Sequence, residues 1–252
     1  MTQTTKVLLI KVPAVTLGFW IIKILCTTLG ETGGDAFSMT WNLGYLVSTG
    51  IFAVLLIGLV VAQIKTKTFK PWLYWATIIA STTAGTTLAD FADRSLHIGY
   101  TGGTLLLLSL LLITLFAWKK STGTISVDSI SNPKSEIFYW TAITFSQTLG
   151  TALGDWFADT NGLGYLHSAF AFGVLLLLVT FLYFRTKVSK VMLFWAAFIL
   201  TRPLGAVVGD FLDKPFAKGG LDISRPMISL ILLVAIAILI IVLPQKAAGK
   251  QH

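Results

Sequence analysis

The stretch Trp20–Asp35, WIIKILCTTLGETGGD, decides the fold because its spacing recurs three more times along the chain. In each copy a tryptophan is followed ten residues later by a glycine and fifteen residues later by an aspartate. The four frames are Trp20/Gly30/Asp35, Trp75/Gly85/Asp90, Trp140/Gly150/Asp155 and Trp195/Gly205/Asp210. A fixed internal period indicates repeated structural units. We therefore expect four equivalent units, each carrying one acidic group at the same depth.

A second motif follows each aspartate. Nine residues after the first three aspartates stand the pairs Gly44-Tyr45, Gly99-Tyr100 and Gly164-Tyr165, and Gly219-Gly220 takes this place in the fourth unit. Corresponding tryptophans of units one and three, Trp20 and Trp140, are 120 residues apart, as are those of units two and four. This predicts a duplicated half: residues 1–120 and 136–252, joined by a flexible cytoplasmic linker over 121–135.

The composition is that of a polytopic membrane protein. Of 252 residues, 55% are hydrophobic and 12% are charged, and the mean hydropathy is +0.80. A spanning helix needs about 20 mostly apolar residues. Eight such stretches fit, namely 12–35, 43–63, 71–92, 99–118, 137–158, 165–184, 191–212 and 226–243. We expect an all-α integral membrane fold of four αα-hairpin repeats, pseudo-symmetric about an axis along the membrane normal.

The charges predict the orientation. Thirteen of the 19 Lys and Arg lie near the termini or in three alternate loops, whereas nine of the 11 acids lie at the opposite side of an eight-helix arrangement. By the positive-inside rule, both termini are cytoplasmic in a bacterial inner-membrane protein that crosses the bilayer many times. The net charge of +8 thus reflects topology, and we expect no nucleic-acid partner. The sequence leaves the oligomeric state open, homo-oligomers included.

Each odd-numbered helix carries a polar stripe. Residues four apart share a helical face, so the motif aspartate aligns with the residues three, seven and eleven positions after the tryptophan. The stripes are Lys23-Thr27-Glu31-Asp35, Ile78-Thr82-Thr86-Asp90, Ile143-Gln147-Thr151-Asp155 and Phe198-Arg202-Ala206-Asp210. Charged groups inside a membrane face a partner, water or the protein interior. We expect the four stripes to converge on a common axis.

Simpler interpretations compete with some of these assignments. The glycines supply small surfaces for helix packing, and the tryptophans suit an aromatic belt at the membrane interface. The aspartates alternatively cap helices, bond to loops, or pair with Arg94, Lys214 and Arg225. Lys23 and Arg202 alternatively do no more than neutralise nearby acids. Pro203 interrupts a helix beside Arg202 and offers a hinge.

The stripe predicts an oxygen-lined site. We assign ion or substrate binding to Asp35, Asp90, Asp155, Asp210, Glu31, Thr27, Thr86, Thr151 and Gln147, and counter-charge or gating to Lys23 and Arg202. Carboxylates and hydroxyls suit Mg, Ca or Mn, with the four aspartates as metal ligands and His97 and His167 as supplements for a metal such as Mn. The single cysteine, Cys26, excludes cysteine clusters. We expect no other cofactor.

The four Trp-x9-Gly-x4-Asp frames and the three Gly-Tyr pairs resemble those of a family of bacterial polytopic proteins described only as membrane-anchored. That family is built from four copies of a two-helix repeat of unknown function. The resemblance spans nearly the whole chain and implies the fold and a bacterial origin, but no activity. The fourth unit departs from the pattern, with Arg202-Pro203 before its glycine.

These features favour a membrane transporter for a small cation, either a divalent metal such as Mn or a proton-coupled solute. One alternative is a transporter of a small organic anion that uses Lys23 and Arg202. Another is a scaffold or sensor that transports nothing. Nucleophile and zinc-protease motifs are absent from the sequence, so we do not expect an enzyme.

Overall fold

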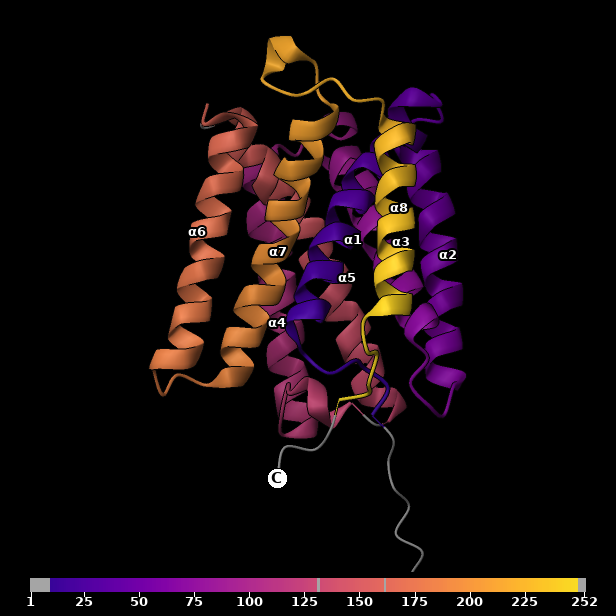
Figure 1. Cartoon of the computed structure of the whole chain (residues 1–252), viewed down its shortest axis with the longest axis vertical. Coiled ribbons are helices and arrows are strands. Elements are labelled where there is room, and N and C mark those ends of the chain that lie inside the picture. Colours follow the sequence, from indigo (N-terminus) through magenta and orange to yellow (C-terminus); the bar gives the residue numbers. More distant parts are fainter. Residues whose placement is uncertain (1–9, 131, 161, 249–252) are drawn as a thin grey trace, which may run out of the picture.

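The computed structural model describes residues 10–130, 132–160 and 162–248, and within them the chain is all-α with eight long helices (Figure 1). The eight helices are α1 (Leu17–Asp35), α2 (Tyr45–Lys65), α3 (Pro71–Asp90), α4 (Tyr100–Thr122), α5 (Pro133–Asp155), α6 (Gly164–Arg185), α7 (Lys190–Asp213) and α8 (Arg225–Val242). All eight run along the long axis of the bundle (Figure 1). The outermost residues of the two predicted halves, 1–9 and 249–252, and Ser131 of the predicted linker lie outside the described residues.

Length and composition make this a multi-span membrane protein. Five helices, α2, α4, α6, α7 and α8, are long and apolar enough to cross a membrane. The remaining three, α1, α3 and α5, carry polar stripes that lower their hydropathy. Large apolar side chains such as Leu105, Phe170 and Ile241 are exposed on the even-numbered helices, as expected for a surface that faces lipid.

The four odd-numbered helices form an inner ring. Each packs against two others, in the order α1, α3, α5, α7 and back to α1. The even-numbered helices surround this ring: α2 packs on α3, α4 on α5, α6 on α7, and α8 on α1. The prediction of hairpins therefore needs a correction, because the two helices of one repeat do not pack side by side. The residues 41–44 and 96–99, for example, carry the chain across to the next repeat, so that every unit is completed by its neighbour.

The motif glycines explain how closely the ring packs. An added Cβ on Gly85 would lie 2.9 Å from the backbone nitrogen of Thr148, and one on Gly150 would overlap the Cγ of Arg202. The same contact recurs around the ring. Each motif glycine contacts a residue on the next inner helix, and that residue always stands seven positions after the motif tryptophan of its own helix. The four pairs are Gly30 with Thr82, Gly85 with Gln147, Gly150 with Arg202, and Gly205 with Thr27. The prediction that these glycines serve helix packing is confirmed.

Three of the four motif tryptophans are buried, so the aromatic-belt interpretation is wrong for these three; Trp20 is partly buried. Trp75, Trp140 and Trp195 are 1%, 5% and 3% exposed. The indole nitrogen of Trp75 donates to the side-chain oxygen of Gln245 at 3.1 Å, and that of Trp195 donates to the carbonyl of Ile125 at 3.0 Å. The reason is that other segments of the chain, which include Ile125 and Gln245, cover the ends of the inner helices and exclude lipid from them.

The described part of the segment between the halves, predicted from composition as a flexible linker, contributes apolar residues to the core. Helix α4 continues to Thr122, and Val127 and Ile130 lie in the hydrophobic core. Asn132 and Ser135 then form a capping box at the start of α5. Val127 and Ile130 are 7% and 1% exposed, and the carbonyl of Ile125 accepts from Trp195, so this Ser-rich segment is anchored to the core.

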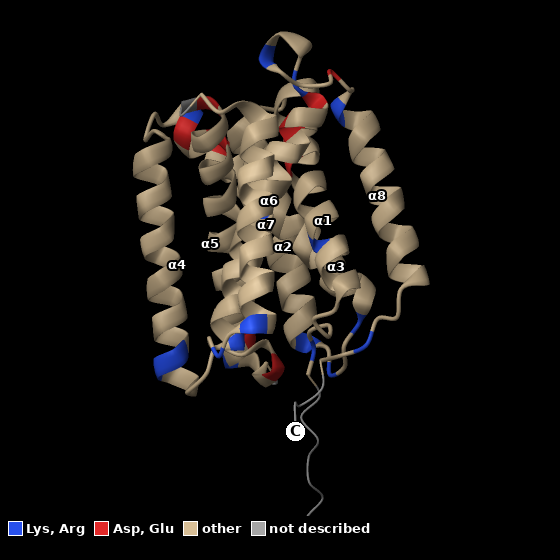
Figure 2. Ribbon diagram, turned by 60° about the vertical axis from the view of Figure 1, so that its left-hand side comes forward, with Lys and Arg blue, Asp and Glu red and all other residues tan. Residues whose placement is uncertain are grey.

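The two ends of the described chain lie against each other. Pro13 and Ala247 form an isolated antiparallel β-bridge, and the chain segments before α1 and after α8 lie at the same end of the bundle (Figure 1). Residues 12–16, expected at the start of the first span, are therefore in extended chain, and α1 begins only after Thr16, whose hydroxyl caps it. We call this the basic end; the opposite end, where the motif aspartates lie, is the acidic end. Most of the acidic residues lie at the acidic end, together with a few basic ones (Figure 2).

Candidate ion-binding site in the inner ring

Residues from all four inner helices meet at Arg202 of α7. Its Nη2 donates to Glu31 Oε2 of α1 at 3.0 Å, and to the hydroxyls of Thr86 on α3 and Thr151 on α5. Arg202, Thr86 and Thr151 are fully buried, and Glu31 is 2% exposed. The predicted convergence of the stripes on one axis is therefore confirmed at this level. Glu31 and Arg202 form a buried ion pair, the alternative raised for the arginine from the sequence.

The motif aspartates lie one turn nearer the acidic end and are joined in two pairs by cations. Lys214 Nζ lies 2.6 Å from Asp35 Oδ2 and 2.9 Å from Asp210 Oδ1. Arg94 Nε lies 2.8 Å from Asp90 Oδ1, and its Nη2 lies 3.5 Å from Asp155 Oδ2. All four aspartates are buried. The alternative of pairing with these cations is thus what the structure shows.

Sequence reasoning did not assign these two bridges to specific partners, although a signal is present. Arg94 and Lys214 each stand four residues after a motif aspartate, in units two and four. Each binds its own aspartate and that of a neighbouring unit. Burial alone would lower the pKa of Lys214, but Asp210, Asp35 and Asp213 raise it well above its usual value. Asp90 and Asp155 raise the pKa of Arg94 in the same way.

A third cation completes the cluster on one side. Arg225, at the start of α8, places its Nε 3.0 Å from Asp213 Oδ2 and 3.5 Å from Asp35 Oδ2. Lys214 is also 3.8 Å from Asp213. Six buried carboxylates thus face the four cations Arg94, Arg202, Lys214 and Arg225. When all are ionised, this set has two more negative than positive charges.

Three of the carboxylates have the spacing of metal ligands. Oxygen atoms of Glu31, Asp35 and Asp210 lie within 4.8 Å of one another, and the residues are 2%, 1% and 3% exposed. The oxygen atoms come from α1 and α7, which pack directly together. An all-oxygen set of this kind suits hard cations. The Oδ1 atom of Asp35 has no hydrogen-bond partner among the described residues.

Some predicted ligands lie elsewhere. Asp90 and Asp155 are held by Arg94, outside the three-carboxylate cluster. His97 and His167 are exposed, and the Nδ1 of each lies 3.1 Å from a nearby backbone carbonyl, that of Ser95 or Leu163. Within the part of the chain that the structure describes, neither histidine joins the cluster of acids.

Of three further predicted residues, Thr27 and Gln147 stand at the repeat position that corresponds to Arg202, and Lys23 stands one turn nearer the basic end. The hydroxyl of Thr27 donates to the carbonyls of Ile24 and Thr201. Lys23 is fully buried and lies 3.5 Å from the hydroxyl of Thr201. Gln147 is fully buried, and its amide has no hydrogen-bond partner among the described residues.

A cavity of about 360 Å³ opens beside the aspartates at the acidic end. It is lined by Arg94, Asp159, Tyr165, Asp210, Lys214 and Lys218, among others. Directly after Asp35, Asp90 and Asp155 the chain makes a five-residue π-helical turn, at Ala36–Thr40, Phe91–Ser95 and Trp156–Thr160. Such turns recur at functional sites. The cavity gives Asp210 and Lys214 a route to the surface.

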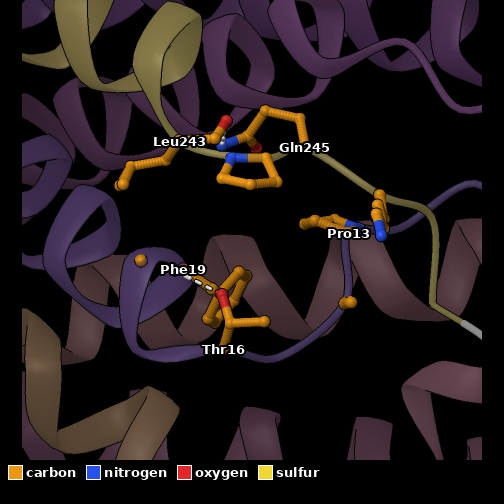
Figure 3. A pocket seen from close by; sticks show the side chains of 9 residues that line it. Pro13, Thr16, Phe19, Leu243 and Gln245 are labelled. Atoms are coloured by element: carbon orange, nitrogen blue, oxygen red, sulfur yellow. Dashed lines mark hydrogen bonds between the residues drawn. The ribbon is translucent and has the colours of Figure 1, made fainter.

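A second cavity, of about 170 Å³, lies at the basic end where the termini meet (Figure 3). Pro13, Phe19 and Leu243 line it, together with Thr16 and Gln245. The polar groups of the last two are already engaged: Thr16 accepts from the backbone nitrogen of Phe19, and Gln245 accepts from Trp75. This cavity has the character of a packing gap at the closure of the ring.

Four segments of the chain match a family model described as Repeat of Unknown Function (DUF347), at residues 18–69, 73–124, 138–189 and 193–244. The match confirms the resemblance drawn from the tryptophan, glycine and aspartate frames. No curated protein and no solved structure gives a significant match.

Proposed function

This chain belongs to the DUF347 repeat family, whose function is unknown, and we propose that it is a membrane transporter that carries a small cation through the buried acidic site. The supporting observation is the cluster of Glu31, Asp35 and Asp210, whose oxygens lie within 4.8 Å of one another inside the inner ring. The proposed cation is a divalent metal such as Mn, or protons coupled to a solute. No catalytic chemistry forms part of the proposal.

The charge of the site supports a cation. A charged side chain at the centre of a bilayer costs about 2.5–3.5 kcal/mol on insertion scales, and the six carboxylates face only four cations. One divalent ion, or two protons, balances the remaining two negative charges. Like-charged carboxylates at such short range favour any species that neutralises them.

The proposed path begins at the acidic end, which the positive-inside distribution would place outside the cell. A cation entering the cavity would meet Asp210 first and would compete with Lys214 for Asp35 and Asp210. Glu31, held by Arg202, is the next carboxylate along the axis. Pro203 follows Arg202 within α7 and weakens the helix there. A change in the contact between Glu31 and Arg202 would therefore act on a part of α7 that can bend.

The test is flux into proteoliposomes, with ⁵⁴Mn²⁺ uptake and internal pH followed in parallel. Asp210→Asn and Glu31→Gln should each lower the rate at least about tenfold, the size of effect seen when groups that support a metal site are removed. Asp222→Asn is the matched control: Asp222 is exposed and has a φ of 53°, a conformation that asparagine tolerates well. This variant should transport normally.

Two results would overturn the proposal. Full flux in Asp210→Asn and Glu31→Gln would show that these carboxylates are not the transport site. Absence of both Mn²⁺ and proton movement in the unaltered protein would show that it transports neither ion. Saturable ⁵⁴Mn²⁺ binding without flux would instead favour a sensor that uses the same carboxylates.

A further inference from the structure

Polar side chains on the basic side of Glu31 lack partners. Arg202 uses Nη2 for its three acceptors, but its Nε and Nη1 have no hydrogen-bond partner among the described residues. The same holds for both amide atoms of Gln147 and for the hydroxyl of Thr82. All three residues are 0% exposed. An unmade hydrogen bond of a buried group costs about 1–3 kcal/mol, so this layer is strongly under-satisfied.

Lys23 adds a basic group without an acidic partner to the same region. It is 0% exposed, and no carboxylate of the described residues lies within ion-pair distance of it. Its side-chain nitrogen lies 3.5 Å from the hydroxyl of Thr201 and 4.2 Å from the centre of the Phe198 ring. Neither contact supplies a negative charge. A buried ammonium without a counter-ion is unfavourable by several kcal/mol.

These groups lie at neighbouring levels of one axis. Gln147 and Arg202 both stand seven residues after a motif tryptophan, on α5 and α7, which pack together. Arg202 lies over Gly150, three residues beyond Gln147 on the same helix. Lys23 stands four residues before the corresponding position of α1, or about 6 Å along the axis. Donors from three inner helices therefore stand within about one helical turn of one another along the axis.

We propose that this layer, formed by Lys23, Gln147 and Arg202, binds a small carboxylate or similar oxyanion. Such an anion accepts hydrogen bonds from the free guanidinium and amide nitrogens and supplies the counter-charge that Lys23 lacks. Water molecules would satisfy the hydrogen bonds but not the charge. A second cation would be repelled by two positive side chains. The protein then has two adjacent sites of opposite charge, separated by the Glu31–Arg202 pair.

The test measures anion binding directly, independently of transport. Detergent-solubilised protein is unfolded by heat while sodium acetate replaces sodium gluconate, a bulkier anion, at constant sodium concentration. Acetate should raise the midpoint of unfolding saturably, as expected for a ligand of the folded state. Lys23→Met and Gln147→Leu should raise the concentration for the half-maximal shift at least about tenfold, which corresponds to about 1.4 kcal/mol. Gln63→Leu is the control, because Gln63 is a buried glutamine of α2 that also has an unpartnered amide nitrogen.

Gln147→Glu separates an anion site from a structural role. This substitution keeps the size of the side chain and places a carboxylate in the layer that Lys23 and Arg202 make basic. It should raise the midpoint without acetate and abolish the response to acetate, whereas a merely structural glutamine would lose stability on the change.

Four results would overturn the proposal: equal responses to acetate in all variants, no response of the unaltered protein to acetate, a lower midpoint for Gln147→Glu, or a high-resolution map in acetate that shows only water on the axis. Asp210→Asn should leave the acetate response intact, so failure of the cation proposal is distinguishable from failure of this one.

Discussion

Gly85→Ala tests the packing of the inner ring on which both proposed sites depend. An added Cβ would lie 2.9 Å from the backbone nitrogen of Thr148 and 3.0 Å from the carbonyl carbon of Gln147. Backbone atoms cannot rotate away as the end of a side chain can. Helices α3 and α5 must therefore separate by several tenths of an ångström to accept one methyl group.

The magnitude follows from two opposing effects. Alanine favours a helix over glycine by about 1 kcal/mol, whereas overpacking a close contact costs about 1–3 kcal/mol. Gly173→Ala in α6 isolates the first effect, because nothing lies within 4 Å of a Cβ built at Gly173. The difference between the two variants is the packing cost alone. At about 2–4 °C per kcal/mol for a chain of this size, Gly85→Ala should unfold about 2–12 °C below Gly173→Ala.

The assay is thermal unfolding in detergent, followed by the fluorescence of the buried tryptophans, with both variants in one buffer. A Gly85→Ala midpoint equal to or above that of Gly173→Ala would refute the close approach of α3 and α5. The position of Gln147 in the ring would then also be wrong.

Two other predictions concern the ion pairs. Glu31→Gln and Arg202→Gln should each destabilise the protein by about 3–5 kcal/mol, because each leaves a buried partner unpaired. In a double-mutant cycle, the double variant should lose less free energy of unfolding than the sum of the two single losses. Strictly additive losses would contradict the ion pair. Lys214→Met should lower the unfolding midpoint equally at pH 7 and pH 9. Asp210 and its neighbours raise the pKa of Lys214, so its contribution is complete below the unfolded-state pKa of about 10.4 and is lost only as pH rises through the folded-state pKa; a smaller loss at pH 9 would contradict this.

The sequence predicted the parts of this fold that depend on one helix at a time. Hydropathy located the eight helices, and the four-residue spacing identified the face of each inner helix that turns inward. The prediction that Glu31 and the threonines of units two and three share an axis with Arg202 is confirmed, because a polar stripe on an apolar helix has only the interior to face.

What the sequence did not predict are choices between partners. Periodicity does not say that α2 packs on α3 instead of α1, since an apolar helix fits either neighbour. The same limit applies to Arg94, whose second partner, Asp155, lies 61 positions further along the chain. Trp195 was expected at the lipid interface because its neighbours are basic, but Ile125 covers it from a segment 70 positions away. Contacts of this kind depend on the packing of the whole ring.

The duplication explains why charge is repeated at the acidic end but not on the axis. Arg94 and Lys214 are 120 positions apart and make equivalent bridges, so the acidic end keeps the two-fold relation of the halves. An arginine at the position of Arg202 cannot be repeated in every unit, because four guanidinium groups on one axis would repel one another in a medium of low dielectric constant.

The corresponding residues of the other units are Thr27, Thr82 and Gln147, which are neutral. Divergence at these positions therefore gives a ring of four similar helices a single buried pair of Arg202 and Glu31. Substitution of Thr82 by a second arginine should therefore abolish folding, because two buried guanidinium groups would face each other on the axis.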